Sequence, residues 1–232
     1  MGRGAVIVLT GASGGIGAAL LSVLTEIDHV IGIYNATPPE TPESDRLSFE
    51  QVDIRDLGAI AAFVEKRKKD LSRVTVVHGA VSSIDGLAAE LSESDWDTVM
   101  GINLKGNFLL TQALLPAMIA EKWGRIIHLS SVVGTNGVPG TLAYSASKTG
   151  LQGMSAVLAR EYARFNITSN ILVLGYFEVG LIETLSEEQR KDIVARIPGK
   201  KLGAVSNIAE AVAFLVRSDY TNAAVINLDG GL

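Results

Sequence analysis

The sequence predicts a doubly wound α/β domain, in which helices cover both faces of a mostly parallel seven-stranded sheet. Short apolar runs bounded by turn residues alternate with helical patterns along the whole chain. A glycine-rich stretch stands between the first such run and the first helical pattern. No repeat and no linker divides the 232 residues, so residues 1–232 are predicted to form a single domain.

Composition excludes several classes of function. The net charge of -5 offers no basic surface to nucleic acid or to an anionic membrane. The absence of cysteine excludes disulfides and thiolate metal sites, and the three histidines are scattered, so we expect no metal site. No apolar run approaches the roughly 20 residues of a membrane span. The chain runs directly into a strand without a visible signal peptide, and we expect a cytoplasmic protein.

The first strand is predicted at residues 5–10, an apolar run typical of a strand covered on both faces. It leads into Gly11, Gly15 and Gly17, and a helix is predicted over residues 18–25. Glycines between a strand and a helix let the backbone approach a pyrophosphate, and the helix N-terminus supplies free N–H donors. This context favours a nucleotide-binding loop over an ordinary glycine-rich turn.

The second strand, residues 29–33, runs into Tyr34 and Asn35. Three prolines in the next stretch predict a loop where a helix is common. Many folds that bind NAD place an acidic residue at this strand end, on the ribose 2′-hydroxyl. Its absence permits NADP, although no basic residue is present for the 2′-phosphate, so NADP(H) is only slightly favoured over NAD(H).

The third strand is predicted at residues 47–53. Asp53 at its end either accepts from an adenine amine or caps the following helix. That helix is predicted over residues 56–70, with the basic run 66–69 solvated at its C-terminus. The fourth strand, residues 74–77, leads to His78, Gly79 and Ala80. We expect small residues here to let a cofactor come close, and His78 to be a hydrogen-bonded loop residue, not a catalyst.

A long helix is predicted from residue 94 to about residue 120. Within it, Asn103 is either a solvated surface residue, the interpretation that we favour, or a buried one with a function. The fifth strand is predicted at residues 124–129, and Ser130 and Ser131 follow at its C-terminal end, where ligands bind in open parallel sheets. Tyr144 and Lys148 follow on a predicted helix, four apart and therefore on one face. A neighbouring ammonium is expected to lower the pKa of the phenol and to make Tyr144 useful in proton transfer.

The sixth strand is predicted at residues 168–173 and the seventh at residues 225–228. Between them, Ser186 and Gln189 match a capping box, and Ser206 is predicted to cap a helix that ends near residue 217. The excursion at about residues 175–205 is expected to form a lid over a substrate site.

From Ala5 to Leu232 the chain resembles the short-chain dehydrogenase/reductase family, whose fold is of Rossmann type. The features that carry the resemblance are Thr10-Gly-Ala-Ser-Gly-Gly-Ile-Gly17, Asn103, Ser131, Tyr144-x-x-x-Lys148 and the terminal Asp229-Gly-Gly. Within the family it looks most similar to 3-oxoacyl-acyl-carrier-protein reductases. The resemblance implies that Tyr144 exchanges a proton with the substrate, Lys148 lowers its pKa and binds the nicotinamide ribose, Ser131 donates to the substrate oxygen, and Asn103 holds a relay water.

The resemblance also implies a set of cofactor contacts: Gly11, Ser13, Gly15, Ile16, Gly17, Tyr34, Asn35, Asp53, Ile54, Gly79, Ala80, Tyr144, Lys148, Gly175 and Phe177. The chain departs from the family at His78-Gly79-Ala80-Val81, at Leu174, at Val179 and at Gly14. These departures bear on cofactor affinity and preference. Lys122 and Arg125, with Arg164, are the basic residues expected to dock an acidic carrier.

The function expected from this is that of an NAD(P)(H)-dependent oxidoreductase on a small-molecule ketone or secondary alcohol, with a 3-oxoacyl thioester reductase preferred. Alternatives are an alcohol dehydrogenase for a cyclic or other small hydroxyl substrate, and a non-catalytic cofactor sensor on the same fold. The resemblance further implies a homodimer or homotetramer. Apolar residues on the helix at residues 142–165 are compatible with such an interface: Leu151, Met154, Val157, Leu158 and Tyr162.

Overall fold

The computed structural model describes residues 4–232, apart from the side chains of Leu181 and Thr184, and forms the predicted doubly wound α/β domain. Seven strands form one sheet in the order β3-β2-β1-β4-β5-β6-β7, and every pairing between neighbours is parallel. Their bounds are β1 Val6–Thr10, β2 His29–Tyr34, β3 Leu47–Gln51, β4 Val74–His78, β5 Gly124–Ser131, β6 Ile167–Leu174 and β7 Val225–Leu228.

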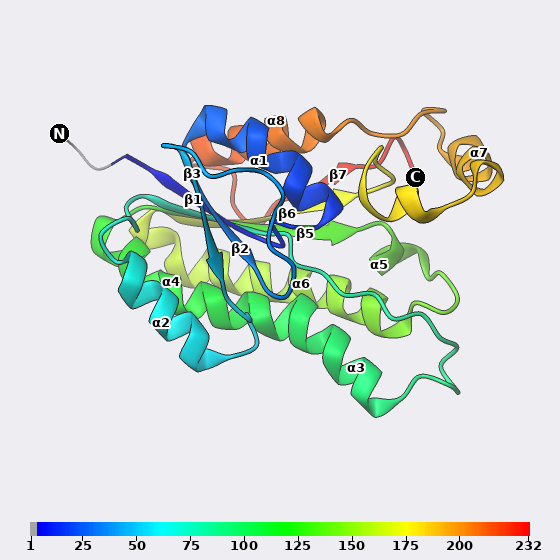
Figure 1. The fold of residues 1–232 in the computed structure, drawn as a ribbon, viewed down its shortest axis with the longest axis horizontal. Helices are drawn as coiled ribbons and strands as arrows, with labels where there is room; N and C mark the ends of the chain where they lie inside the picture. Colours follow the sequence, from blue (N-terminus) through cyan, green and yellow to red (C-terminus); the bar gives the residue numbers. More distant parts are fainter. Residues whose placement is uncertain (1–3) are drawn as a thin grey trace.

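Helices cover both faces of this sheet, as Figure 1 shows. One face carries α1 (Gly15–Ile27) and α8 (Val205–Arg217), and the other carries α2 (Leu57–Arg67), α4 (Asn107–Glu121) and α6 (Leu142–Tyr162). Each layer encloses its own hydrophobic cluster, because inner strands expose apolar side chains to both faces. The shorter elements are α3 Glu93–Met100, η1 Gly101–Gly106, α5 Val133–Asn136, η2 Ala163–Phe165, η3 Gly180–Thr184 and α7 Glu187–Arg196.

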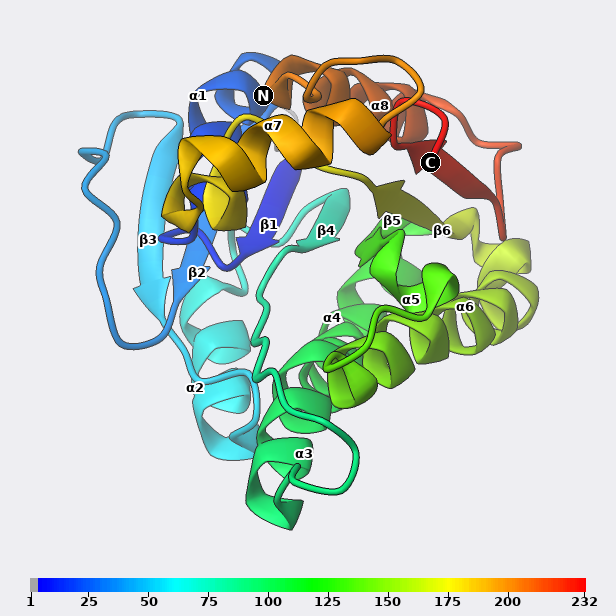
Figure 2. The ribbon, with the colours of Figure 1, turned by 90° about the vertical axis from the view of Figure 1, so that its right-hand side faces the viewer.

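The strand order reverses between β1 and β4, from which the chain builds outward in opposite directions. Figure 2 looks onto the carboxyl ends of the strands, where the glycine-rich loop, the segment after β4, α5 and α7 gather. In open parallel sheets ligands bind outside this end, at the reversal point.

Several predicted element boundaries were wrong. The third strand ends at Gln51 instead of residue 53, and the second helix ends at Arg67 instead of residue 70. The helix predicted over residues 94–120 consists of α3, the π-helix η1 and α4. In η1 the backbone hydrogen bonds join residues five apart, so they interrupt the i→i+4 bonds of the α-helix. The first helix begins at Gly15 instead of residue 18. The last begins at Val205 with Ala204 as its N-cap, so Ser206 lies inside it. The predicted capping box of Ser186 and Gln189 is confirmed.

Three basic residues from the predicted solvated run and the predicted docking set form contacts within the fold. The Arg67 Nε lies 2.6 Å from Oε1 of the buried Glu50 on β3, and the Lys66 Nζ lies 2.8 Å from its Oε2. The Arg125 guanidinium is buried over the Trp123 ring and donates to backbone carbonyls, including that of Val216 at 3.2 Å. Burial lowers its pKa, and Arg125 is not available to dock a carrier.

Within residues 4–232, no helix is both long and apolar enough to cross a bilayer.

Candidate active site

Tyr144 and Lys148 project from the first turns of α6 toward the carboxyl end of β5, where Ser131 lies. The Lys148 Nζ lies 5.6 Å from the centre of the Tyr144 ring and donates to the Leu129 carbonyl at 2.7 Å. Lys148 is buried, and Ser131 is within hydrogen-bonding reach of the Tyr144 side chain. The structure therefore brings these three residues together.

The pKa of Tyr144 is raised, contrary to the expectation that Lys148 lowers it. Burial of the phenol has the largest effect, the hydrogen bond with Ser131 acts in the opposite direction, and the Asp85 carboxylate raises the pKa further. The ammonium of Lys148 faces the ring and is bound to a backbone carbonyl. Burial lowers the pKa of Lys148 itself to about 8. Tyr144 is therefore a protonated phenol at neutral pH.

Asn103 is fully buried, so its interpretation as a solvated surface residue was wrong. It lies on the π-helix, and its side chain forms hydrogen bonds with two separate segments of the chain. Oδ1 accepts from the Ser82 N–H at 2.8 Å, and Nδ2 donates to the Ser82 carbonyl at 2.8 Å and to the Ser147 hydroxyl at 3.1 Å. Both amide hydrogens are thus used within the protein, and Asn103 joins the segment after β4 to α6.

A second contact holds the segment after β4, at Gly86. Gly86 pairs with Thr141 in a parallel bridge, and its N–H donates to the Gly140 carbonyl at 2.8 Å. This bridge holds the preceding residue, Asp85, near Tyr144 closely enough to affect the phenol. Sequence reasoning missed Asp85, because only the pairing of two distant loops brings it to the site.

His78 is the last residue of β4, not a loop residue, and it pairs in register with His128 on β5. The two rings stack with centres 4.9 Å apart and an interplanar angle of 7°. The Nε2 atom of His78 lies 2.8 Å from the Thr111 hydroxyl. Burial lowers the pKa of His128 to about 3 and that of His78 well below its usual value, with the nearby Lys148 charge acting in the same direction. Both rings are therefore neutral and buried, close enough to Lys148 for its charge to affect them.

The glycine-rich loop has the close backbone contacts that a pyrophosphate cradle requires. A Cβ on Gly17 would lie 2.0 Å from the Gly11 carbonyl oxygen, and a Cβ on Gly11, whose φ is +73°, would lie 2.8 Å from Ala80. Gly14 caps α1 without a side-chain hydrogen bond, and Ser13 and Ile16 are partly exposed beside it. No side chain caps the N-terminal N–H groups of α1, so the donors that a dinucleotide needs in this loop are not bonded to a capping side chain.

The turn at Gly79 and Ala80 is pinned to β1. Both of their N–H groups donate to the Thr10 hydroxyl at 3.0 Å. A Cβ on Gly79 would lie 2.8 Å from the Thr10 carbonyl oxygen, so glycine is needed for this close approach. The turn lies against Gly11, which brings these predicted cofactor residues together with the glycine-rich loop.

The residues predicted to contact the adenosine half lie at the ends of β2 and β3. Tyr34 is partly exposed and Asn35 is exposed. Asp53 does not cap α2, because Asp56 does so, with Oδ1 accepting from Gly58 at 2.7 Å. The Asp53 carboxylate instead pairs with Arg55 Nη2 at 2.7 Å, and this pairing lowers the pKa of Asp53. Ile54 is buried in the core.

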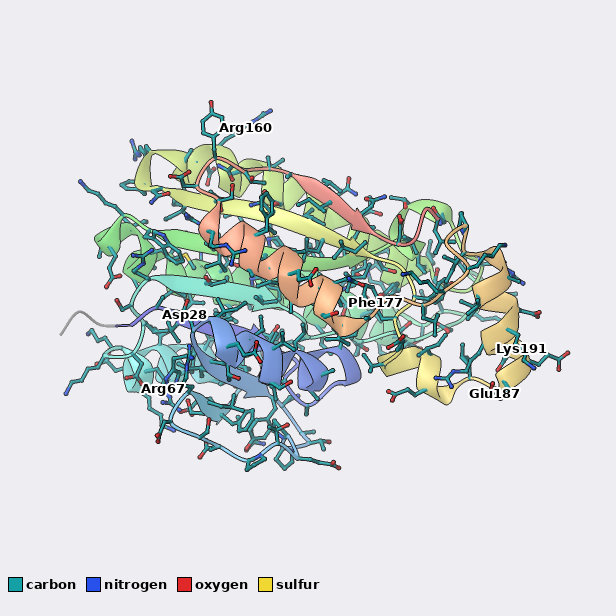
Figure 3. All side chains as sticks on the ribbon, turned by 90° about the horizontal axis from the view of Figure 1, so that it is seen from above. Asp28, Arg67, Arg160, Phe177, Glu187 and Lys191 are labelled. Atoms are coloured by element: carbon teal, nitrogen blue, oxygen red, sulfur yellow. The ribbon has the colours of Figure 1, made fainter. Side chains whose placement is uncertain are left out.

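The segment after β6 lies across the glycine-rich loop. Phe177 buries its ring in the core against Gly203, so only its backbone can face a cofactor, and Figure 3 shows it toward the end of the molecule where α7 lies. A Cβ on Gly175 would lie 2.7 Å from the Asp229 Cα, so Gly175 packs against the terminal Asp229-Gly-Gly. The carboxylate of Glu183 lies 3.6 Å from the position of a Gly15 Cβ. Glu183 thus places a negative charge at the N-terminus of α1.

A separate groove lies away from this site. This groove, of about 1030 Å³, lies between α1 and α8 at the opposite end of the sheet, lined by residues that include Asp28, Trp123 and Arg125. In Figure 3 Asp28 lies far from α7, which carries Glu187 and Lys191. The groove holds none of the predicted catalytic residues.

The comparisons with known proteins agree with this geometry. Residues 5–190 match the family described as short chain dehydrogenase. The chain is 37% identical over 240 residues to nodulation protein G of a Rhizobium species, covering 100% of this chain and 97% of that protein. It is 34% identical over 238 residues to the 3-oxoacyl-acyl-carrier-protein reductase FabG of Escherichia coli, covering 99% and 98%. The FabG reductase of Thermotoga maritima is 34% identical over 242 residues, with the same two shares.

The match to the family spans most of the chain, and the similarity to these relatives covers 97% and 98% of their lengths. Use of NAD(P)(H) in the interconversion of ketones and alcohols follows from the family. The chain is therefore an enzyme of the short-chain dehydrogenase/reductase family.

Proposed function

We propose that the enzyme reduces a 3-oxoacyl thioester to the 3-hydroxyacyl thioester, with NADP(H) slightly preferred over NAD(H). The observation that carries the proposal is the convergence of Ser131, Tyr144 and Lys148 at the carboxyl end of β5, beside the glycine-rich loop. Relatives named as 3-oxoacyl-acyl-carrier-protein reductases support the thioester as substrate.

The proton that completes the alcohol comes from Tyr144. Because its pKa is raised, the phenol holds its proton at neutral pH and donates it to the carbonyl oxygen as negative charge develops there. Ser131 donates a second hydrogen bond to that oxygen and orients the carbonyl. The ammonium of Lys148, whose Nζ lies 5.6 Å from the centre of the ring, would attract the phenolate that remains. A bound nicotinamide supplies the hydride.

The raised pKa of Tyr144 also favours reduction of a ketone over oxidation of a secondary alcohol. Oxidation needs Tyr144 as a phenolate that accepts the alcohol proton, and burial and Asp85 both oppose that form. The alternative, oxidation of a small or cyclic alcohol, requires alkaline conditions or a change at Tyr144 when cofactor binds.

The cofactor contacts of Tyr34, Asn35, Asp53 and Ile54, and the excursion at about residues 175–205 as a lid, belong to this proposal. We also propose a cytoplasmic homodimer or homotetramer. Phe108 on α4 and Val157 on α6 support an interface on that face, with 45% and 54% of their surfaces exposed. Of the five apolar residues first considered for this interface, Leu151, Met154, Leu158 and Tyr162 instead pack against the core clusters.

The test is oxidation of NADPH and, separately, of NADH by the purified enzyme, with an acetoacetyl thioester as acceptor. Turnover that is faster with NADPH supports the proposal in full. Faster turnover with NADH overturns only the cofactor preference. Bound cofactor without turnover overturns the thioester reductase and directs the search to other ketones and alcohols.

A further inference from the structure

Three polar side chains line one face of the largely apolar segment that runs through η1 and α4. Asn103, Asn107 and Thr111 are four residues apart, and all three are buried. Thr111 contacts the ring of His78 at 2.8 Å. Asn107 instead donates its side-chain amide to the backbone carbonyl of Asn103 at 3.0 Å. This stripe therefore reaches the candidate active site through Asn103.

Asn103 joins two elements that the reaction needs in register. Its side chain binds the backbone of Ser82, in the segment that follows β4, and the hydroxyl of Ser147 on α6. Ser147 in turn donates to the carbonyl of Tyr144 at 2.7 Å. A rotation of the Asn103 backbone would therefore shift the Ser82 segment relative to Tyr144.

The amide of Asn107 restrains that backbone. The π-helix replaces the usual i→i+4 bonds around Asn103 with wider i→i+5 bonds, so the regular ladder is interrupted at this residue. A buried side-chain donor at 3.0 Å fixes the direction of the Asn103 carbonyl. Asn107 is itself anchored at the first position of α4.

An asparagine at position 107 is not expected to give the most stable folded state. Its Oδ1 is buried and has no hydrogen-bond partner among the side-chain and backbone groups of residues 4–232. A buried acceptor without a partner is unfavourable, and an apolar side chain of similar size, such as leucine, would avoid it. Replacement of Asn107 by leucine would remove the unpaired Oδ1, which stabilises the fold. It would also remove the hydrogen bond to the Asn103 carbonyl, which destabilises the fold.

We propose that Asn107 is a positioning residue of the reaction, which holds the Asn103 carbonyl and thereby keeps the Ser82 segment and Tyr144 in register. The inference rests on the proposed function in that Tyr144 acts on the substrate. Asn107 touches neither substrate nor cofactor and acts through Asn103.

The experiment compares Asn107→Leu with the wild type and with Thr111→Val. The control variant removes one buried hydrogen bond from the same face one turn further on, without touching Asn103. Two quantities are measured: the exchange rate of the Ser82 amide hydrogen, which donates to Asn103, and kcat with an acetoacetyl thioester.

We expect Asn107→Leu to speed exchange at Ser82 about tenfold or more. We expect kcat to fall about 10- to 100-fold, as misplaced groups do, with an unchanged KM for the cofactor. The melting temperature should stay within about 3 °C of the wild type, because the opposing effects on stability are of similar size. Thr111→Val should exchange at Ser82 like the wild type.

Unchanged exchange at Ser82 in Asn107→Leu would overturn the proposal, and so would faster exchange with an unchanged kcat. If the leucine variant does not fold, Asn107→Ala removes the same donor without an added branch and gives the same two readouts. A wild type without turnover would overturn the proposed thioester substrate, and exchange at Ser82 would still decide whether Asn107 restrains Asn103.

Discussion

The stacked pair of buried histidines makes the fold sensitive to acid. Burial keeps the pKa of His128 at about 3 in the folded protein, whereas an unfolded chain has a histidine pKa near ~6.5. Below that pH the unfolded state binds a proton that the folded state does not bind, so the free energy of unfolding falls as the pH falls. The effect is absent above about pH 6.5 and is complete near pH 3.

The magnitude follows from the two pKa values. Each pH unit below ~6.5 is worth about 1.4 kcal/mol, so at pH 5 His128 alone lowers the free energy of unfolding by about 2 kcal/mol. For a chain of this size, that corresponds to about 4–8 °C in melting temperature. His78, whose pKa is shifted in the same direction, adds to the loss.

The assay is thermal unfolding at pH 7 and at pH 5 of the wild type, His128→Gln and the control His29→Gln. Glutamine retains a donor near the position of Nε2 but does not titrate, so the drop in melting temperature between the two pH values should be smaller by about 4–8 °C in His128→Gln. His29 lies at the partly exposed start of β2, and its variant should behave as the wild type does. An equal drop in all three proteins would refute the reasoning, because it would mean that His128 is not kept neutral by the fold.

Three further substitutions test the site. Asp85→Asn removes a charge that raises the pKa of Tyr144, so the alkaline limb of kcat/KM for reduction should move to lower pH, and an unmoved limb would contradict the contact. Glu183→Gln removes a negative charge beside Gly15, and calorimetry should show about two- to fivefold tighter binding of NADPH; weaker binding would mean that Glu183 assists the cofactor. Gly17→Ala places a Cβ 2.0 Å from a carbonyl oxygen, so it should abolish NADPH binding and lower the free energy of unfolding by about 1–3 kcal/mol, whereas wild-type binding would show that the loop can widen.

Local patterns in the sequence predicted the fold well because its elements are short and strongly patterned. Apolar runs located the strands, and the i, i+4 spacing brought Tyr144 and Lys148 to one face of α6. The alternation of strands and helices was enough to predict a parallel sheet whose carboxyl ends gather Ser131 and the glycine-rich loop.

Properties that depend on distant contacts could not be predicted in this way. Asn103 looked solvated, since nothing in its own helix shows that Ser82 and Ser147 lie against it. The stack of His78 on His128 requires the register between β4 and β5. The raised pKa of Tyr144 has the same origin, because burial and the carboxylate of Asp85, in a distant loop, outweigh the hydrogen bond with Ser131.

The replacement of Tyr144 by phenylalanine tests the central claim most directly. Phenylalanine retains the ring that lies against Lys148 and removes only the hydroxyl that is proposed to donate the proton. With an acetoacetyl thioester as acceptor, kcat should fall by about 10²- to 10⁴-fold while the Kd for NADPH stays within about twofold of the wild type. Turnover by Tyr144→Phe at the wild-type rate would contradict the account, because another group would then supply the proton.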